Sequence, residues 1–294
     1  MSRPTALQIS DPVQQDVTDM KLGTPSHICG LPNRDVCIAD SQNHCLWVVS
    51  SSGKIKYRIG TGNKGNKNGH LRDSEFSSPQ AMVVFHNSLF VADTGNNEVR
   101  EVSLKNASVL TMPKSVASPV DIYEFQEKLF IISSGQSKIN CYDPLRHQFV
   151  ASFDSECKQP SGLATNGELL FYTDLATSSI KAWDGKTVQT LYTPASPTDL
   201  NKPMGLSYSG NKLYIADTYN HQIKSYSIGS KNIEPLAGIG KAGNQSGPLA
   251  TAALNYPTSL FVTGMSIFVC DRGNNQIKFV DLLQARVHEL KVQR

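Results

Sequence analysis

Acidic and imidazole side chains recur at fixed spacings along this chain, and they are the first candidates for chemistry. Five aspartates each end a short apolar run, and a serine takes the same place in a sixth run; these anchors are Asp40, Asp93, Ser133, Asp174, Asp217 and Asp271. His44 and His221 stand four residues after two of them. Aspartate and histidine can act as general acid and base or hold a metal ion. Because both recur in register, we predict instead that they hydrogen bond to neighbouring backbone and so serve a repeated structure.

His27 and Asp121 are the strongest candidate metal ligands outside these runs. Each stands two residues after a proline, where we expect a strand that lines a central channel. A catalytic metal site usually takes about three protein ligands, and calcium takes six or more oxygen ligands. Two candidates are too few, so we predict no metal and no cofactor.

Familiar catalytic motifs are missing from the sequence. His-Glu-x-x-His, Gly-x-Ser-x-Gly and Cys-x-x-Cys do not occur. Gly-x-Gly-x-x-Gly occurs twice, at Gly60–Gly65 and Gly238–Gly243, but without the βαβ unit that a dinucleotide site needs. The balance favours a non-catalytic role, with a triad assembled from distant loops left open.

The residues around each anchor agree from copy to copy. An aromatic residue stands three positions before it in five copies, and a branched aliphatic stands six after it in all six. A proline precedes it by fourteen or fifteen residues: Pro25, Pro79, Pro119, Pro160, Pro203 and Pro257. The anchors are 53, 40, 41, 43 and 54 residues apart by subtraction. Short strands bounded by turn residues at this period predict an all-β fold, a six-bladed β-propeller with four antiparallel strands per blade.

The segments Asp40 to Leu46 (Asp-Ser-Gln-Asn-His-Cys-Leu) and Asp217 to Ile223 (Asp-Thr-Tyr-Asn-His-Gln-Ile) resemble the NHL repeat. Asp93 to Val99 and Asp271 to Ile277 match with Asn in place of His, while the third and fourth copies depart from the pattern. The resemblance covers roughly residues 24 to 293 and implies a six-bladed propeller that serves as a binding platform for protein or RNA. A minority of related propellers are lyases or lactonases.

We expect residues 1–15 to be a flexible lead-in and residues 16–294 to form one propeller domain. The ring needs a closing device. One hypothesis is that Val17 to Leu22 adds a strand to the last blade; the alternative is that Val287 to Val292 completes that blade and the ring closes by side-chain packing alone.

Bulk properties favour an intracellular, cytoplasmic protein. The six cysteines show no paired spacing, which suits a reducing compartment. No secretory signal or membrane-spanning run is apparent, so we predict no membrane association. The formal charge of +3 over 294 residues is too small to argue for nucleic acid by itself. We expect a monomer or a domain of a larger protein.

Two long loops, Gly60 to Pro79 and Gly238 to Pro257, are predicted to be extended versions of one interblade loop on the same face as the anchor loops. On this rim we predict a partly basic crescent that binds a partner. Its residues are Lys64, Lys67, His70, Arg72, Asn96, Asn97, Tyr219, Asn220, His221, Lys241, Arg272, Asn274 and Asn275. The partner is predicted to be a protein or peptide, acidic in character. The alternatives are RNA on the same rim, or a metal-dependent lyase or lactonase at the channel mouth.

Overall fold

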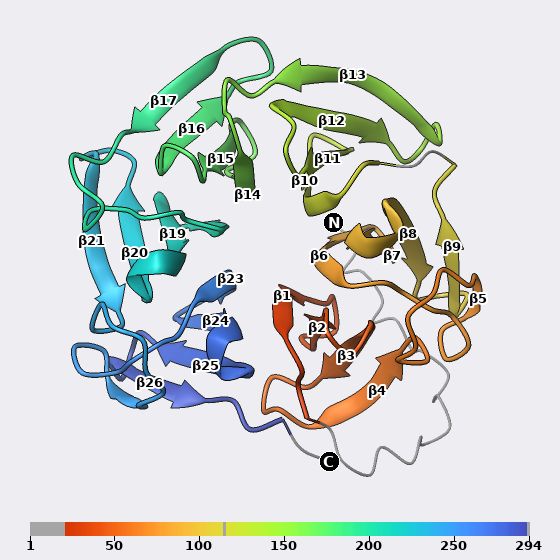
Figure 1. Cartoon of the computed structure of the whole chain (residues 1–294), viewed down its shortest axis with the longest axis horizontal. Coiled ribbons are helices and arrows are strands. Elements are labelled where there is room, and N and C mark those ends of the chain that lie inside the picture. The colour runs from red at the N-terminus through yellow and green to blue at the C-terminus, as the bar shows by residue number, and fades with distance from the viewer. Residues whose placement is uncertain (1–20, 114–115, 293–294) are drawn as a thin grey trace, which may run out of the picture.

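A computed structural model describes residues 21–113 and 116–292 and shows six antiparallel sheets arranged as blades around a central axis (Figure 1). This confirms the predicted six-bladed propeller. The prolines at the start of the innermost strands occupy the one strand position where a missing N–H does no harm. The innermost strands are β1 (Pro25–Gly30), β6 (Pro79–Phe85), β10 (Pro119–Phe125), β14 (Pro160–Thr165), β18 (Gly205–Ser209) and β23 (Pro257–Thr263).

The second strand of each blade ends at the predicted anchor residue. It is almost wholly buried between the neighbouring blades. These strands are β2 (Val36–Asp40), β7 (Ser88–Asp93), β11 (Lys128–Ser133), β15 (Leu170–Asp174), β19 (Lys212–Asp217) and β24 (Ser266–Asp271). Single-turn 3₁₀ helices follow three anchors: η1 (Thr94–Asn96), η2 (Thr218–Asn220) and η3 (Arg272–Asn274). Among the described residues, no helix is long and apolar enough to cross a membrane.

Each blade continues outward with two more strands. The third strands are β3 (Cys45–Val49), β8 (Glu98–Ser103), β12 (Lys138–Asp143), β16 (Ser179–Trp183), β20 (Gln222–Ser227) and β25 (Gln276–Asp281). The fourth strands are β4 (Ile55–Ile59), β9 (Ser108–Thr111), β13 (Gln148–Asp154), β17 (Val188–Tyr192), β21 (Asn232–Ala237) and β26 (Arg286–Glu289). Blades are numbered 1 to 6 in chain order.

The two long loops have the same structure, as predicted, but they do more than extend the rim. Each adds a two-residue strand outside the fourth strand of the following blade: β5 (Gly69–His70) pairs with β9, and β22 (Gly247–Pro248) pairs with β26. Blades 2 and 6 therefore have five strands. Each loop leaves the rim, runs along the outer wall of the blade that follows it, and returns to the proline that begins that blade.

The core consists of six apolar clusters, one between each pair of neighbouring blades. The cluster between blades 6 and 1 joins Phe268 and Cys270 to Ile38, Trp47 and other side chains of blade 1. Such burial stabilises the ring by roughly 25 cal/mol for each square ångström of apolar surface removed from water.

The C-terminal part of the chain completes blade 6, as the alternative hypothesis stated. It forms the fourth strand, β26, whose Val287 pairs with Val280 of β25 on one side and with Gly247 of β22 on the other. Lys21 and Leu22 form no strand, and Leu22 packs into the closing cluster. The N-terminal strand hypothesis is therefore wrong for these two residues; Val17 to Met20 and the predicted lead-in lie outside the described residues.

Replacing Phe268 by Ala should lower the free energy of unfolding by about 3–5 kcal/mol, because it opens a cavity in the closing cluster. Urea unfolding measures the change. Leu145→Ala is the control: this side chain is 65% exposed, and its loss should change the free energy of unfolding by less than about 0.5 kcal/mol. Equal effects of the two substitutions would contradict closure by packing.

Candidate functional site

The anchor carboxylates bind the interblade loop that precedes the proline of their own blade. Oδ1 of Asp217 accepts the backbone N–H of Asn201 at 2.7 Å, and Oδ2 accepts the side-chain amide of Asn220 at 2.7 Å. Asp93 and Asp271 make the equivalent pairs of bonds. The anchors therefore bond to neighbouring backbone, as predicted. Asp40 and Asp174 also accept a backbone N–H three or two residues after themselves, whereas the three anchors followed by 3₁₀ helices bind the Asn side chain at that place.

The repeated histidines hold the next blade, as predicted. Nδ1 of His221 accepts the N–H of Tyr256 at 3.1 Å, and Nδ1 of His44 accepts the N–H of Ser78 at 3.0 Å. Asn97 and Ser178 stand at the equivalent positions of blades 2 and 4. Their side-chain oxygens accept the N–H groups of Ser118 and Lys202, which lead into the next blade. Each accepted N–H belongs to the residue just before a proline. Nδ1 can accept this hydrogen bond only when the imidazole is neutral. Burial lowers the pKa of His221 and so also favours the neutral form.

A buried cation stands seven residues after four anchors, a feature that the sequence analysis missed. These cations are Arg100, Lys181, Lys224 and Lys278. Lys224 Nζ lies 2.7 Å from Asp217 Oδ2 and donates to the carbonyls of Thr198 and Asp199 in the preceding loop. The signal was present in the sequence, because a Lys or Arg recurs in register in four copies. A cation at such a position offsets a buried carboxylate and fixes a loop at the same time.

Several predicted rim residues are used by this framework. The amides of Asn96, Asn220 and Asn274 each donate to the anchor acid and to a loop carbonyl, at 2.7 or 2.8 Å. Asn97 and His221 hold the following blade. These five side chains therefore all make bonds that the architecture uses, and the partner-binding role predicted for them stays a prediction.

The predicted basic residues do not form one crescent. Lys64, Lys67 and Lys241 are exposed in the long loops. His70 lies in β5, opposite Ser108 on the outer wall of blade 2, and Arg72 follows two residues later. Arg272 lines the mouth of the central channel, and Asn275 is exposed beside it in sequence. The structure thus separates residues that the sequence placed together.

An exposed aromatic surface lies where blade 5 meets blade 6. Tyr219 and Tyr256 are 46% and 41% exposed, with ring centroids 5.4 Å apart, and His221 packs edge-on to Tyr256 at 4.6 Å. Lys202 Nζ lies 4.7 Å over the ring of Tyr219. Ile239, 48% exposed, follows Gly238, whose carbonyl accepts the side-chain amide of Gln222, the residue after His221. We call Lys202, Tyr219, Ile239 and Tyr256 the aromatic rim patch.

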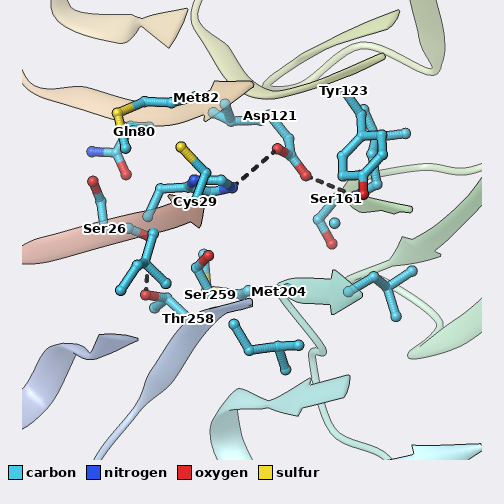
Figure 2. Close-up of a pocket in the computed structure, with 18 of the residues that line it drawn as sticks. Ser26, Cys29, Gln80, Met82, Asp121, Tyr123, Ser161, Met204, Thr258 and Ser259 are labelled. Atoms are coloured by element: carbon cyan, nitrogen blue, oxygen red, sulfur yellow. Dashed lines mark hydrogen bonds and ion pairs between the residues drawn. The ribbon is translucent and has the colours of Figure 1, made fainter. Parts of the chain in front are cut away.

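The second candidate site is a cavity of about 370 Å³ in the channel, bounded by the innermost strands of all six blades. Figure 2 shows Asp121 facing the imidazole of blade 1, with Cys29 and Met82 beside this gap. His27 Nε2 and Asp121 Oδ1 are 4.0 Å apart. Asp121 Oδ1 accepts the N–H of Ile122 and its Oδ2 accepts that of Leu163 in blade 4. His27 and Asp121 thus both face the channel, as expected.

Burial moves both ionisation equilibria at this pair toward the neutral forms. It raises the pKa of Asp121 to about 7, against the two N–H bonds that lower it, and lowers the pKa of His27 to about 4. The described residues contain no group of three or more His, Cys, Asp or Glu side chains placed to hold a metal ion. The pair can accept hydrogen bonds and can carry one negative charge.

Comparisons with known proteins agree with the repeat and the fold. No family model matches the chain. It is 29% identical to NHL repeat-containing protein 2 of Bos taurus, over 83% of this chain and 44% of that protein. It is 27% identical to Protein SUPPRESSOR OF QUENCHING 1, chloroplastic, of Arabidopsis thaliana, over 98% of this chain and 33% of that protein. The resemblance to NHL-repeat propellers is therefore confirmed, and the chain spans less than half the length of these curated relatives.

A solved structure with a similar fold is virginiamycin B lyase of Staphylococcus aureus. The TM-score is 0.62 at 12% identity, over 92% of this chain and 85% of that chain. At this level of identity the similarity concerns the fold alone.

Replacing His221 by Ala should lower the free energy of unfolding by roughly 1–3 kcal/mol, because the N–H of Tyr256 loses its acceptor. His221→Asn should cost less than about 1 kcal/mol, because Asn97 accepts the equivalent N–H in blade 2. Chemical denaturation of both variants measures this difference. If Asn destabilises as much as Ala, the acceptor role is refuted.

The raised pKa of Asp121 makes stability depend on pH. The ordinary pKa of aspartate is about 4, so the folded protein retains the proton up to about pH 7 while the unfolded chain has lost it. Ionisation therefore costs stability between pH 4 and 7. Asp121→Asn should gain free energy of unfolding relative to the wild type across this window, by on the order of 3 kcal/mol, in urea unfolding at a series of pH values. His27→Gln, which keeps the carboxyl, should follow the wild type; a constant difference between Asp121→Asn and the wild type would contradict the assignment.

Proposed function

We propose that this propeller is a non-catalytic interaction module that binds a segment of a partner protein at the aromatic rim patch. The observation that carries the proposal comes from the repeat itself. Tyr256 and Ser78 occupy equivalent positions, and each donates its backbone N–H to a histidine of the preceding blade. The architecture needs that N–H but not the tyrosine ring, because Ser78 serves at the equivalent position without one; the ring packs edge-on against His221 and the side chain stays 41% exposed. The rings of the patch are therefore available to a partner.

The same comparison applies to the rest of the patch. Tyr219 stands two residues after its anchor, where blade 1 has Gln42, and Ile239 stands where the first long loop has Thr61. Three of the seven large apolar side chains that are exposed in the described chain gather at this junction. Partly exposed aromatic side chains on a rigid scaffold are the kind of anchor that dominates binding energy in protein interfaces.

The charge around the patch favours an acidic partner. Lys202 and Lys241 are exposed there, and no Asp or Glu occurs from Leu236 to Cys270. The nearby carboxylate of Asp199 is occupied by the N–H groups of Ala195 and Ser196. A short segment with an apolar side chain between acidic residues would place the apolar group on the tyrosines and the acids near the lysines.

RNA binding receives less support than the sequence suggested. It would use basic residues together with aromatic stacking surfaces. The structure places His70 and Arg72 on the outer wall of blade 2, away from the two tyrosines at the opposite junction. The lyase or lactonase alternative stays a prediction without an observation that favours it over binding.

The proposal is tested with synthetic 12-residue peptides that carry a central Leu, Phe or Trp between Asp and Glu residues. Peptides of this set should bind the wild type and lose roughly 10- to 30-fold in affinity to the variant Tyr219→Gln/Tyr256→Ser, measured by fluorescence anisotropy. This variant carries the residues of the equivalent positions in blades 1 and 2, so it should fold. Leu283→Ser, at an exposed turn between β25 and β26, is the control and should bind normally.

Two outcomes would overturn the proposal. One is peptide binding that is unchanged in the double tyrosine variant, or equal for peptides with Lys in place of the acids. The other is tight binding of single-stranded RNA with a steep salt dependence, lost in Lys64→Ala/Lys67→Ala/Arg72→Ala, which would assign the rim to RNA.

A further inference from the structure

The channel cavity contains two polar groups that the repeat does not require. The position of His27 and Asp121, two residues after the proline, is held in the other four blades by Ala81, Gly162, Gly205 and Ser259. Four blades therefore form without a polar ring or a carboxyl there. Asp121 accepts two backbone N–H groups, that of Leu163 through Oδ2 and that of Ile122 through Oδ1. Its Oδ1 faces His27 across the channel (Figure 2).

We propose that the channel cavity binds a small organic cation, a protonated amine or amidine with an apolar body, between Asp121 and His27. This site is separate from the aromatic rim patch and does not depend on the proposed partner binding.

The separation of the two acceptors fits a bridging N–H donor. At 4.0 Å, His27 Nε2 and Asp121 Oδ1 are too far apart for a direct hydrogen bond. For a ligand nitrogen about 2.9 Å from each acceptor, the angle Nε2···N···Oδ1 would be roughly 90°. This is close to the angle between two N–H bonds of an ammonium group. The neutral imidazole can offer a lone pair and the carboxylate a charge, so both groups accept.

The remaining walls suit the apolar part of such a ligand. The apolar residues that line the cavity include Met82, Val84, Met204, Leu206 and Phe261. Tyr123, two residues further along the same strand as Asp121, also lines the cavity. A cavity with mainly apolar walls and a few convergent polar groups is the usual form of a small-molecule site.

The charges around the cavity favour a cation at this depth. Its titratable lining groups are His27, Cys29, Asp121, Tyr123 and Arg272. Burial raises the pKa of both Cys29 and Tyr123 to about 12, so neither ionises near neutral pH. The only lining cation is Arg272, and it is not among the groups that shift the pKa of Asp121. The Asp121 carboxylate therefore faces the cavity without a cation of its own.

The inference is tested with benzylammonium, using benzyl alcohol and benzoate as matched neutral and anionic probes. Isothermal titration and the imidazole NMR signals of His27 should show binding of benzylammonium and at least tenfold weaker binding of the other two. Asp121→Asn should abolish the preference for the cation. Asp143→Asn, which alters a buried carboxyl outside the cavity, is the matched control and should bind like the wild type.

The dependence on pH gives a second, independent measurement. Of the lining groups only Asp121 changes protonation between pH 5 and 9, so affinity should be roughly tenfold lower at pH 6 than at pH 8. Failure of all three probes to bind, equal binding of benzoate, or a cation preference that survives Asp121→Asn would each overturn the inference. The variant Tyr219→Gln/Tyr256→Ser should bind benzylammonium like the wild type. This result tests the cavity independently of partner binding at the aromatic rim patch.

Discussion

At the entries to blades 2, 5 and 6, hydrogen bonds to two consecutive backbone N–H groups tie each blade to the one before it. In front of Pro257, Asp271 of the same blade accepts the N–H of Asn255, and His221 of the preceding blade accepts that of Tyr256. One bond ties the loop to the sheet that it leads into, and the other ties it to the sheet behind. Since a proline supplies no N–H of its own, these two groups are the last donors before the proline at these three entries, and both are satisfied.

The burial of so many aspartates follows from this arrangement. Hydrogen bonds from backbone and amide N–H groups, together with a cation beside the carboxylate, offset much of the free energy that is lost when the carboxylate leaves water. Arg100 and Lys224 contribute that cation and also bind carbonyl groups of the loop through their remaining donors. Polar groups that resemble an active site in the sequence thus form a structural network in the folded chain.

The sequence was sufficient for the fold because each signal recurs. The proline, the aromatic, the acid and the branched aliphatic predicted strand ends to within a residue or two, and the roles of His44 and His221 followed from their neutral equivalents. The candidate site was harder to predict for a physical reason. Register shows which residues are equivalent, but it does not show where a long loop runs. Only pairing of β5 with β9 reveals that His70 has left the rim. The proximity of Tyr219 and Tyr256 likewise depends on how two blades meet, which no local pattern records.

Every sheet is formed by one uninterrupted stretch of chain, and the first and last blades meet through packed side chains and through the Thr258 hydroxyl, which donates to the Ser26 carbonyl. Leu22 and Val292, near the two ends of the described chain, pack into the same cluster. The order of the blades around the axis is therefore independent of where the polypeptide starts. A circularly permuted chain that opens between two blades is therefore expected to retain all six sheets.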